Sequence, residues 1–110
     1  PAREVAFPAS VIDMLKGEAD GFPQPHADMD AGVWERTLES AYARFVGMVD
    51  REKETLLDTY GAEHPAEFFA VTSEAFFTAP HALREEFPGV YEQLKLFYRQ
   101  DPAARLPPPA

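Results

Sequence analysis

The segment from Pro65 to Phe77, PAEFFAVTSEAFF, constrains the fold of this chain more than any other stretch. It begins with proline, which suits the first turn of a helix, and it contains no glycine, so the sequence predicts a helix. Apolar residues occupy nearly every position around it, which is typical of a helix inside a domain. Two acids, Glu67 and Glu74, interrupt this pattern. They lie seven positions apart, which at ~3.6 residues per turn places both carboxylates on one face.

Buried carboxylates need a partner, and the residues alone leave three kinds of partner open. The first is an arginine such as Arg84 or Arg99, the second is a set of hydrogen-bond donors, and the third is a metal ion.

The composition excludes several classes of partner. The chain has 110 residues with 19 acids against 10 lysines and arginines, a formal charge of -9. Such a charge repels phosphate backbones and anionic lipids, so we expect neither nucleic acid nor a membrane as a partner. Without cysteine, disulfides and thiolate metal sites are absent. No apolar run reaches the length of a membrane span and no signal-peptide pattern is present, so we expect a cytoplasmic location.

Four other segments are predicted to be helical and none to be a strand, so the predicted fold is all-α. The longest is an amphipathic helix over 31–57, and the shorter ones cover 11–16, 80–86 and 88–100.

The polar residues around these helices have mostly local roles. Asp30 is expected to cap the long helix, and His64 to cap the helix that begins at Pro65. The three histidines show no spacing typical of metal ligands, so His26 and His81 are expected to be solvated or capping side chains.

Two runs, DTYGAEHPAEFFAVTSEAFF (58–77) and FPGVYEQLKLFYRQDP (87–102), resemble the C-terminal part of the Mlc titration factor A (MtfA) family of zinc metallopeptidases. The resemblance continues upstream through VIDMLKGEADGFP (11–23) and the tryptophan Trp34. It implies that residues 11–102 are the helical C-terminal portion of a gluzincin-like domain. Residues 1–10 are then a non-matching leader, and 103–110 a proline-rich disordered tail.

The resemblance also implies roles for four residues. In a gluzincin-like site, two histidines of an HExxH helix and a later glutamate hold zinc, while the motif's own glutamate activates water. The later glutamate falls on Glu67. Tyr60 matches a tyrosine that would donate a hydrogen bond to the oxyanion formed during peptide hydrolysis. Glu74 and Asp13 fall where further acids of the family would orient a ligand.

The sequence departs from the family where the HExxH motif should stand. The five positions before Val11 read AFPAS, with a proline at position 8, and no HExxH occurs elsewhere. Catalytic zinc needs about three protein ligands, so we expect that this chain alone binds no zinc and hydrolyses no peptide. The chain is then either a truncated part of a metallopeptidase or a relative without the ligands, and the sequence does not decide between them.

Two functions from different classes follow. Intact family members are expected to use zinc to hydrolyse peptide substrates in the manner of an aminopeptidase. The alternative is a non-catalytic helical module that binds a protein partner such as a transcriptional repressor. If the active-site helix normally covers Phe68, Val71 and Ala75, its absence exposes apolar surface and favours self-association.

Overall fold

A computed structural model describes residues 21–108 of the chain. This part contains helices and no strand, which confirms the all-α prediction for it. The predicted leader, the predicted helix over 11–16 and Asp13 lie outside the described residues. The elements in chain order are α2 (Ala31–Asp50), the 3-10 helix η1 (Thr59–Ala62), α3 (Pro65–Thr78), α4 (Pro80–Glu86), α5 (Pro88–Tyr98) and α6 (Pro102–Arg105).

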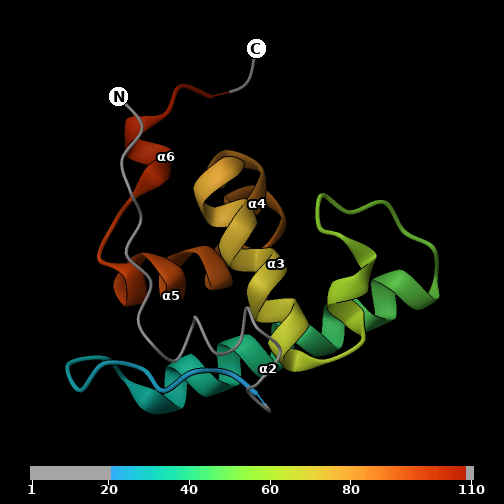
Figure 1. The fold of residues 1–110 in the computed structure, drawn as a ribbon, viewed down its shortest axis with the longest axis horizontal. Helices are drawn as coiled ribbons and strands as arrows, with labels where there is room; N and C mark the ends of the chain where they lie inside the picture. The colour runs from blue at the N-terminus through green and yellow to red at the C-terminus, as the bar shows by residue number, and fades with distance from the viewer. Residues whose placement is uncertain (1–20, 109–110) are drawn as a thin grey trace.

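Helix α3 lies in the middle of this arrangement, as its apolar sequence predicted (Figure 1). It packs against η1, α4, α5 and α2. The residues that it buries are Ala66, Phe68, Phe69, Thr72, Ser73, Ala75 and Phe76.

The prediction that both acids of α3 are buried is wrong. Glu74 is exposed and Glu67 is half-buried, and they share one side of the helix with Ala70, Val71 and Thr78. We call these five residues the outer face of α3. The buried residues of α3 lie on its other sides, whereas on this side η1 reaches it at Val71, so the apolar composition of α3 over-predicted its burial.

The expectation that Phe68 and Ala75 lie uncovered is also wrong. Phe68 is 0% exposed because it packs against the rings of Tyr42, Phe45 and Phe87, with centroids between 5.4 and 6.1 Å away. Ala75 is buried as well, so Val71 is the one residue of that predicted set that remains partly accessible.

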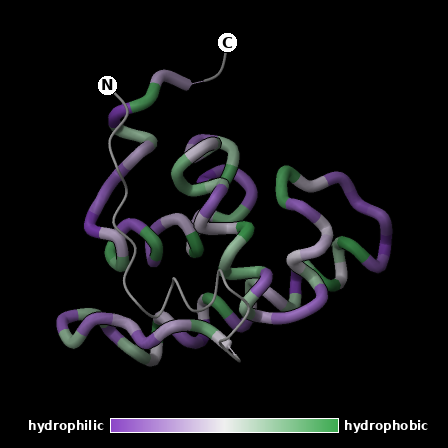
Figure 2. Tube along the Cα trace, in the orientation of Figure 1, coloured by the Kyte–Doolittle hydropathy of each residue, from purple (hydrophilic) through white to green (hydrophobic). Residues whose placement is uncertain are grey.

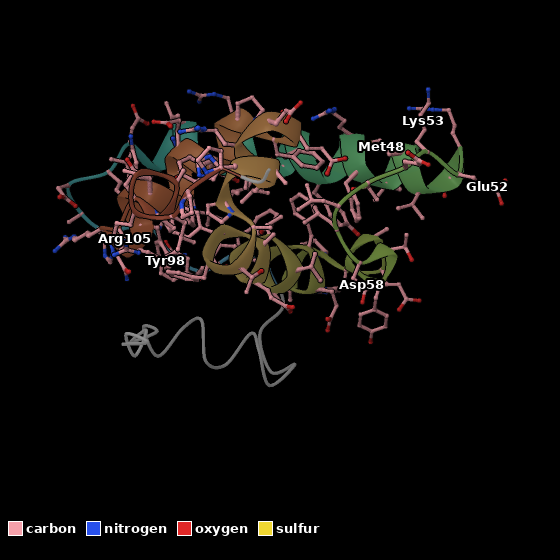
Figure 3. The ribbon with its side chains drawn as sticks, turned by 90° about the horizontal axis from the view of Figure 1, so that it is seen from above. Met48, Glu52, Lys53, Asp58, Tyr98 and Arg105 are labelled. Atoms are coloured by element: carbon pink, nitrogen blue, oxygen red, sulfur yellow. The ribbon has the colours of Figure 1, made fainter. Side chains whose placement is uncertain are left out.

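Helix α2 ends at Asp50, whereas its apolar pattern predicted a helix to residue 57. Glu52 adopts the left-handed conformation, with φ 54°, and its N–H donates to the Val49 carbonyl. The Lys53 N–H donates to the Met48 carbonyl at 2.9 Å. These two bonds form a Schellman motif, which closes the helix here without a glycine (Figure 3).

The loop that follows α2 carries mostly hydrophilic residues, yet it is attached to the rest of the fold (Figure 2). The Thr55 hydroxyl and the Leu56 N–H both donate to the Glu86 carboxylate, at 3.0 and 3.1 Å. Leu57 is buried in the core. Leu56 and Leu57, the last apolar residues of the predicted long helix, therefore attach this loop to the rest of the fold.

The segment before α2 packs on the aromatic core: His26 contacts Phe97 of α5, and Pro23 contacts Trp34 of α2. The His26 ring stacks on Phe97 with centroids 5.1 Å apart, and its Nε2 lies 2.6 Å from the Phe97 carbonyl oxygen. The Trp34 indole N–H donates to the Pro23 carbonyl at 3.1 Å. The His26 ring is therefore not fully solvated, and its contact with a carbonyl in the last turn of α5 is of the predicted capping kind.

Helix α6 was not predicted, and it covers the start of the segment expected to be an irregular tail. The Tyr91 hydroxyl donates to the Asp101 carboxylate and accepts from the Ala103 N–H at 3.0 Å. Tyr98 is buried and donates to the Ser73 hydroxyl at 2.8 Å. No helix in the described part is long and apolar enough to cross a bilayer.

Candidate functional site

The outer face of α3 carries the residues that the sequence singled out. Glu67 and Glu74 lie two turns apart on it, and neither carboxylate forms a hydrogen bond or ion pair with residues 21–108. Within this range Arg99 pairs with Asp28 at 3.6 Å, and Arg84 lies 5.8 Å from the Tyr91 ring. An arginine partner at either of these positions is therefore excluded.

The start of α3 holds Glu67 in place. The His64 ring nitrogen Nδ1 accepts from the Ala66 N–H at 3.0 Å, which confirms the predicted cap, and Pro65 forms the first helical position. Glu67 consequently lies in the first turn, where the unpaired N–H groups of the helix favour a negative charge. A carboxylate placed there is available as a ligand or acceptor.

Helix η1 holds Tyr60 beside this face. The Asp58 carboxylate caps η1 by accepting from the Tyr60 N–H at 2.9 Å. Gly61 is buried directly against Val71, one turn along α3 from Glu67. The Tyr60 side chain is 55% exposed. It is therefore an accessible hydroxyl on an anchored element, as a donor to a bound substrate would need to be.

A pocket of about 160 Å³ opens at the C-terminal half of the outer face. Its lining includes Leu56, Asp58, Val71, Glu74 and Thr78. The sequence had not singled out Asp58, although an aspartate two positions before a tyrosine at the start of a turn is typical of an Asx-turn. The face therefore combines two glutamates with a small hollow of mixed polar and apolar lining, at whose rim Asp58 lies (labelled in Figure 3).

These residues do not form a complete zinc site by themselves. No group of three histidine, aspartate or glutamate side chains lies within reach of one ion anywhere between residues 21 and 108. Zinc in a catalytic site usually has about three protein ligands, so the outer face fits one ligand, Glu67, and not the whole set. No chemical step through a metal follows from the described residues.

Comparison with known proteins agrees with the resemblance seen in the sequence. Residues 8–99 match the family model described as glucose-regulated metallo-peptidase M90. Mlc titration factor A from Yersinia pestis (strain Pestoides F) and from Yersinia pseudotuberculosis serotype O:1b (strain IP 31758) are both similar to this chain. Each is 44% identical to it over 101 residues. The match covers 89% of this chain and 37% of each relative. The chain therefore belongs to the glucose-regulated metallo-peptidase M90 family.

Proposed function

We propose that this chain is the part of a zinc-dependent metallopeptidase domain that supplies one metal ligand, Glu67, and one substrate-binding donor, Tyr60. The observation that carries the proposal is the state of Glu67. Glu67 is half-buried as a residue at the start of a capped helix, and its accessible carboxylate has no partner between residues 21 and 108. A carboxylate held in this way and left unengaged can bind an external cation, and a metal ion is the occupant that the family implies.

The remaining residues of the face have supporting roles in this proposal. Tyr60 donates a hydrogen bond to the oxyanion that forms during peptide hydrolysis, and the contact between Gly61 and Val71 keeps η1 beside α3. Glu74 orients a neighbouring ligand from one side of the same helix. The 110-residue sequence contains no HExxH motif, so we propose that the chain alone does not hydrolyse peptides.

A chimera tests the role of Glu67. The part of the Yersinia pestis relative that matches residues 11–102 is replaced by those residues of this chain, so the segment where the family's HExxH motif stands remains the relative's own, and peptide hydrolysis and zinc content are measured. We expect Glu67→Gln to lower activity by at least ~10², since even residues that only orient a ligand cost 10–100-fold. The matched control is Glu63→Gln, an exposed acid just before α3, which should leave activity unchanged. Full activity in the Glu67→Gln chimera would exclude this residue as a ligand.

A zinc titration of the chain itself tests the incomplete ligand set. By calorimetry at neutral pH without chelator, we expect binding no tighter than millimolar, and no difference between the wild-type chain and Glu67→Gln. Micromolar binding that depends on Glu67 would mean that further ligands exist and that the incomplete-site proposal is wrong.

A second candidate function is binding to a protein partner without catalysis. It is favoured by the exposure of Tyr60 and Leu56, 55% and 37%, at the edge of the α3 outer face. The relatives are named Mlc titration factor A, so purified Mlc is the first partner to test. Replacing Tyr60 and Leu56 by serine should abolish binding, and Leu106→Ser, at an apolar residue exposed elsewhere, should not.

Self-association through the same outer face is a separate proposal, supported by the partly accessible Val71, which lines the pocket with Leu56 and lies against Gly61. Sedimentation of the chain should then show a dimer that Val71→Glu dissociates. A monomer at all concentrations would exclude it.

A further inference from the structure

We propose that a groove between α2 and the start of α5 binds an acidic segment of a protein partner. The groove has a volume of about 440 Å³ and lies outside the α3 outer face. We call it the arginine groove, and the residues that define it are Arg36, Thr37, Ser40 and Arg44 of α2 with Pro88 and Gly89 of α5.

The two arginines concentrate positive charge on a protein whose formal charge is -9. Neither Arg36 nor Arg44 forms an ion pair with an acid in the described part of the chain. Arg44 donates to the Glu86 carbonyl at 2.9 Å and its guanidinium lies 4.6 Å from the centre of the Phe87 ring. These contacts orient Arg44 without neutralising it. The Glu86 carboxylate accepts from Thr55 and the loop backbone instead.

The other polar groups of the groove are available donors. Hydroxyls inside helices commonly bond back to the carbonyl four residues earlier, as Thr78 does to Glu74 at 2.8 Å. The hydroxyls of Thr37 and Ser40 have no hydrogen bond to residues 21–108. Helix α5 also begins without a side-chain cap, so the N–H of the exposed Gly89, which follows the proline at its first position, remains open to a ligand. The groove therefore combines cations and donors, which is the chemistry that recognises carboxylates.

The spacing of the arginines favours an extended peptide, rather than a single small anion, as the occupant of the groove. Arg36 and Arg44 lie eight positions apart, which is ~12 Å along a helix axis. Their heads diverge, because the Arg36 Nη1 lies 2.9 Å from where a Cβ on Gly32 would stand, while Arg44 reaches toward Glu86. The divergence of the heads adds to this axial rise, and an extended peptide rises ~3.3 Å per residue, so the matching carboxylates stand at least about four residues apart. The occupant is therefore an extended segment with two spaced acidic residues.

A pair of peptides tests the groove on the full chain. Ac-Gly-Asp-Gly-Gly-Gly-Asp-Gly-NH2 carries spaced aspartates, and Ac-Gly-Gly-Asp-Asp-Gly-Gly-Gly-NH2 has the same composition with adjacent ones. In an NMR titration at low salt we expect the spaced peptide to bind more tightly and to shift the amide signals of Ser40 and Gly89. Because the whole protein repels an acidic peptide, binding requires a local positive site.

Arginine variants assign the binding to the groove. Arg36→Gln should raise the Kd of the spaced peptide about fivefold, the equivalent of one exposed charge pair. Arg36 is chosen because it makes no ion pair or hydrogen bond with the described residues, and circular dichroism checks that the variant folds. The matched control is Arg51→Gln, an exposed arginine just after the same helix, which should leave the Kd unchanged.

Four results of the binding experiments would overturn the proposal. They are no shift with either peptide, equal binding of both peptides, an equal effect of Arg51→Gln, and equally tight binding of inorganic phosphate. A dimer in sedimentation that Arg36→Gln dissociates would identify a second copy of this chain as the occupant, and would also overturn it.

Discussion

Gly61 lies so close to Val71 that a Cβ on residue 61 would stand 2.6 Å from the Val71 Cγ2 atom. Val71 cannot turn away easily, because a β-branched side chain in a helix has one strongly preferred rotamer. We therefore expect Gly61→Ala to push η1 away from α3 and to lower the free energy of unfolding by about 1–3 kcal/mol. Urea unfolding followed by circular dichroism measures this change.

Gly21→Ala is the control for this substitution, because nothing lies within 4 Å of a Cβ built there. It should change stability by less than about 0.5 kcal/mol. Equal stability of the two variants would show that η1 does not depend on the close contact.

The cap of α3 should tolerate one substitution and not another. His64 accepts from the Ala66 N–H, so His64→Ala leaves that donor unsatisfied and should cost about 1 kcal/mol. His64→Asn supplies another acceptor and should stay close to wild type. Thermal unfolding of both variants checks this, and an equal loss in both would mean that the imidazole acts through packing.

Tyr98 should make the protein sensitive to alkali. Burial raises the pKa of Tyr98 from 10.0 to about 12, although the hydrogen bond from its hydroxyl to Ser73 partly opposes this. The unfolded chain therefore loses this proton first, so the stability that Tyr98 contributes is complete below pH 10 and is lost between about pH 10 and 12.

Tyr98→Phe tests this assignment. The variant should be less stable at neutral pH by about 1–3 kcal/mol, because the buried Ser73 hydroxyl loses its partner. Its stability should nevertheless fall less steeply than that of wild type above pH 10. Urea unfolding at several pH values measures both effects, and parallel curves above pH 10 would contradict the shifted pKa.

Asp101 should contribute to stability at neutral pH and not in acid. The hydrogen bond from the Tyr91 hydroxyl holds the pKa of Asp101 below its usual value of 3.8. The unfolded chain therefore binds this proton first as the pH falls, and the contribution is lost as the pH passes below 3.8 toward the folded pKa. Asp101→Asn should flatten the acid limb of the stability curve, whereas Asp50→Asn, at an exposed aspartate, should not.

Local signals in the sequence predicted where several helices begin. The caps at Asp30 and His64 were predicted, and so were the prolines that open α3, α4 and α5. These signals are reliable because each cap or proline acts on N–H groups within three residues of itself. The end of α2 was missed, because Glu52 adopts a left-handed conformation that usually indicates glycine.

The sequence by itself determined that the chain is helical, that it belongs to its family, and that Glu67 and Glu74 share one face of α3. Helical periodicity determines which residues of one helix share a face. Only the tertiary structure decided which face is open, because that depends on where the other helices pack. It also decided that Tyr60 lies beside α3, since this position rests on the contact between Gly61 and Val71, ten residues apart, which no local pattern encodes.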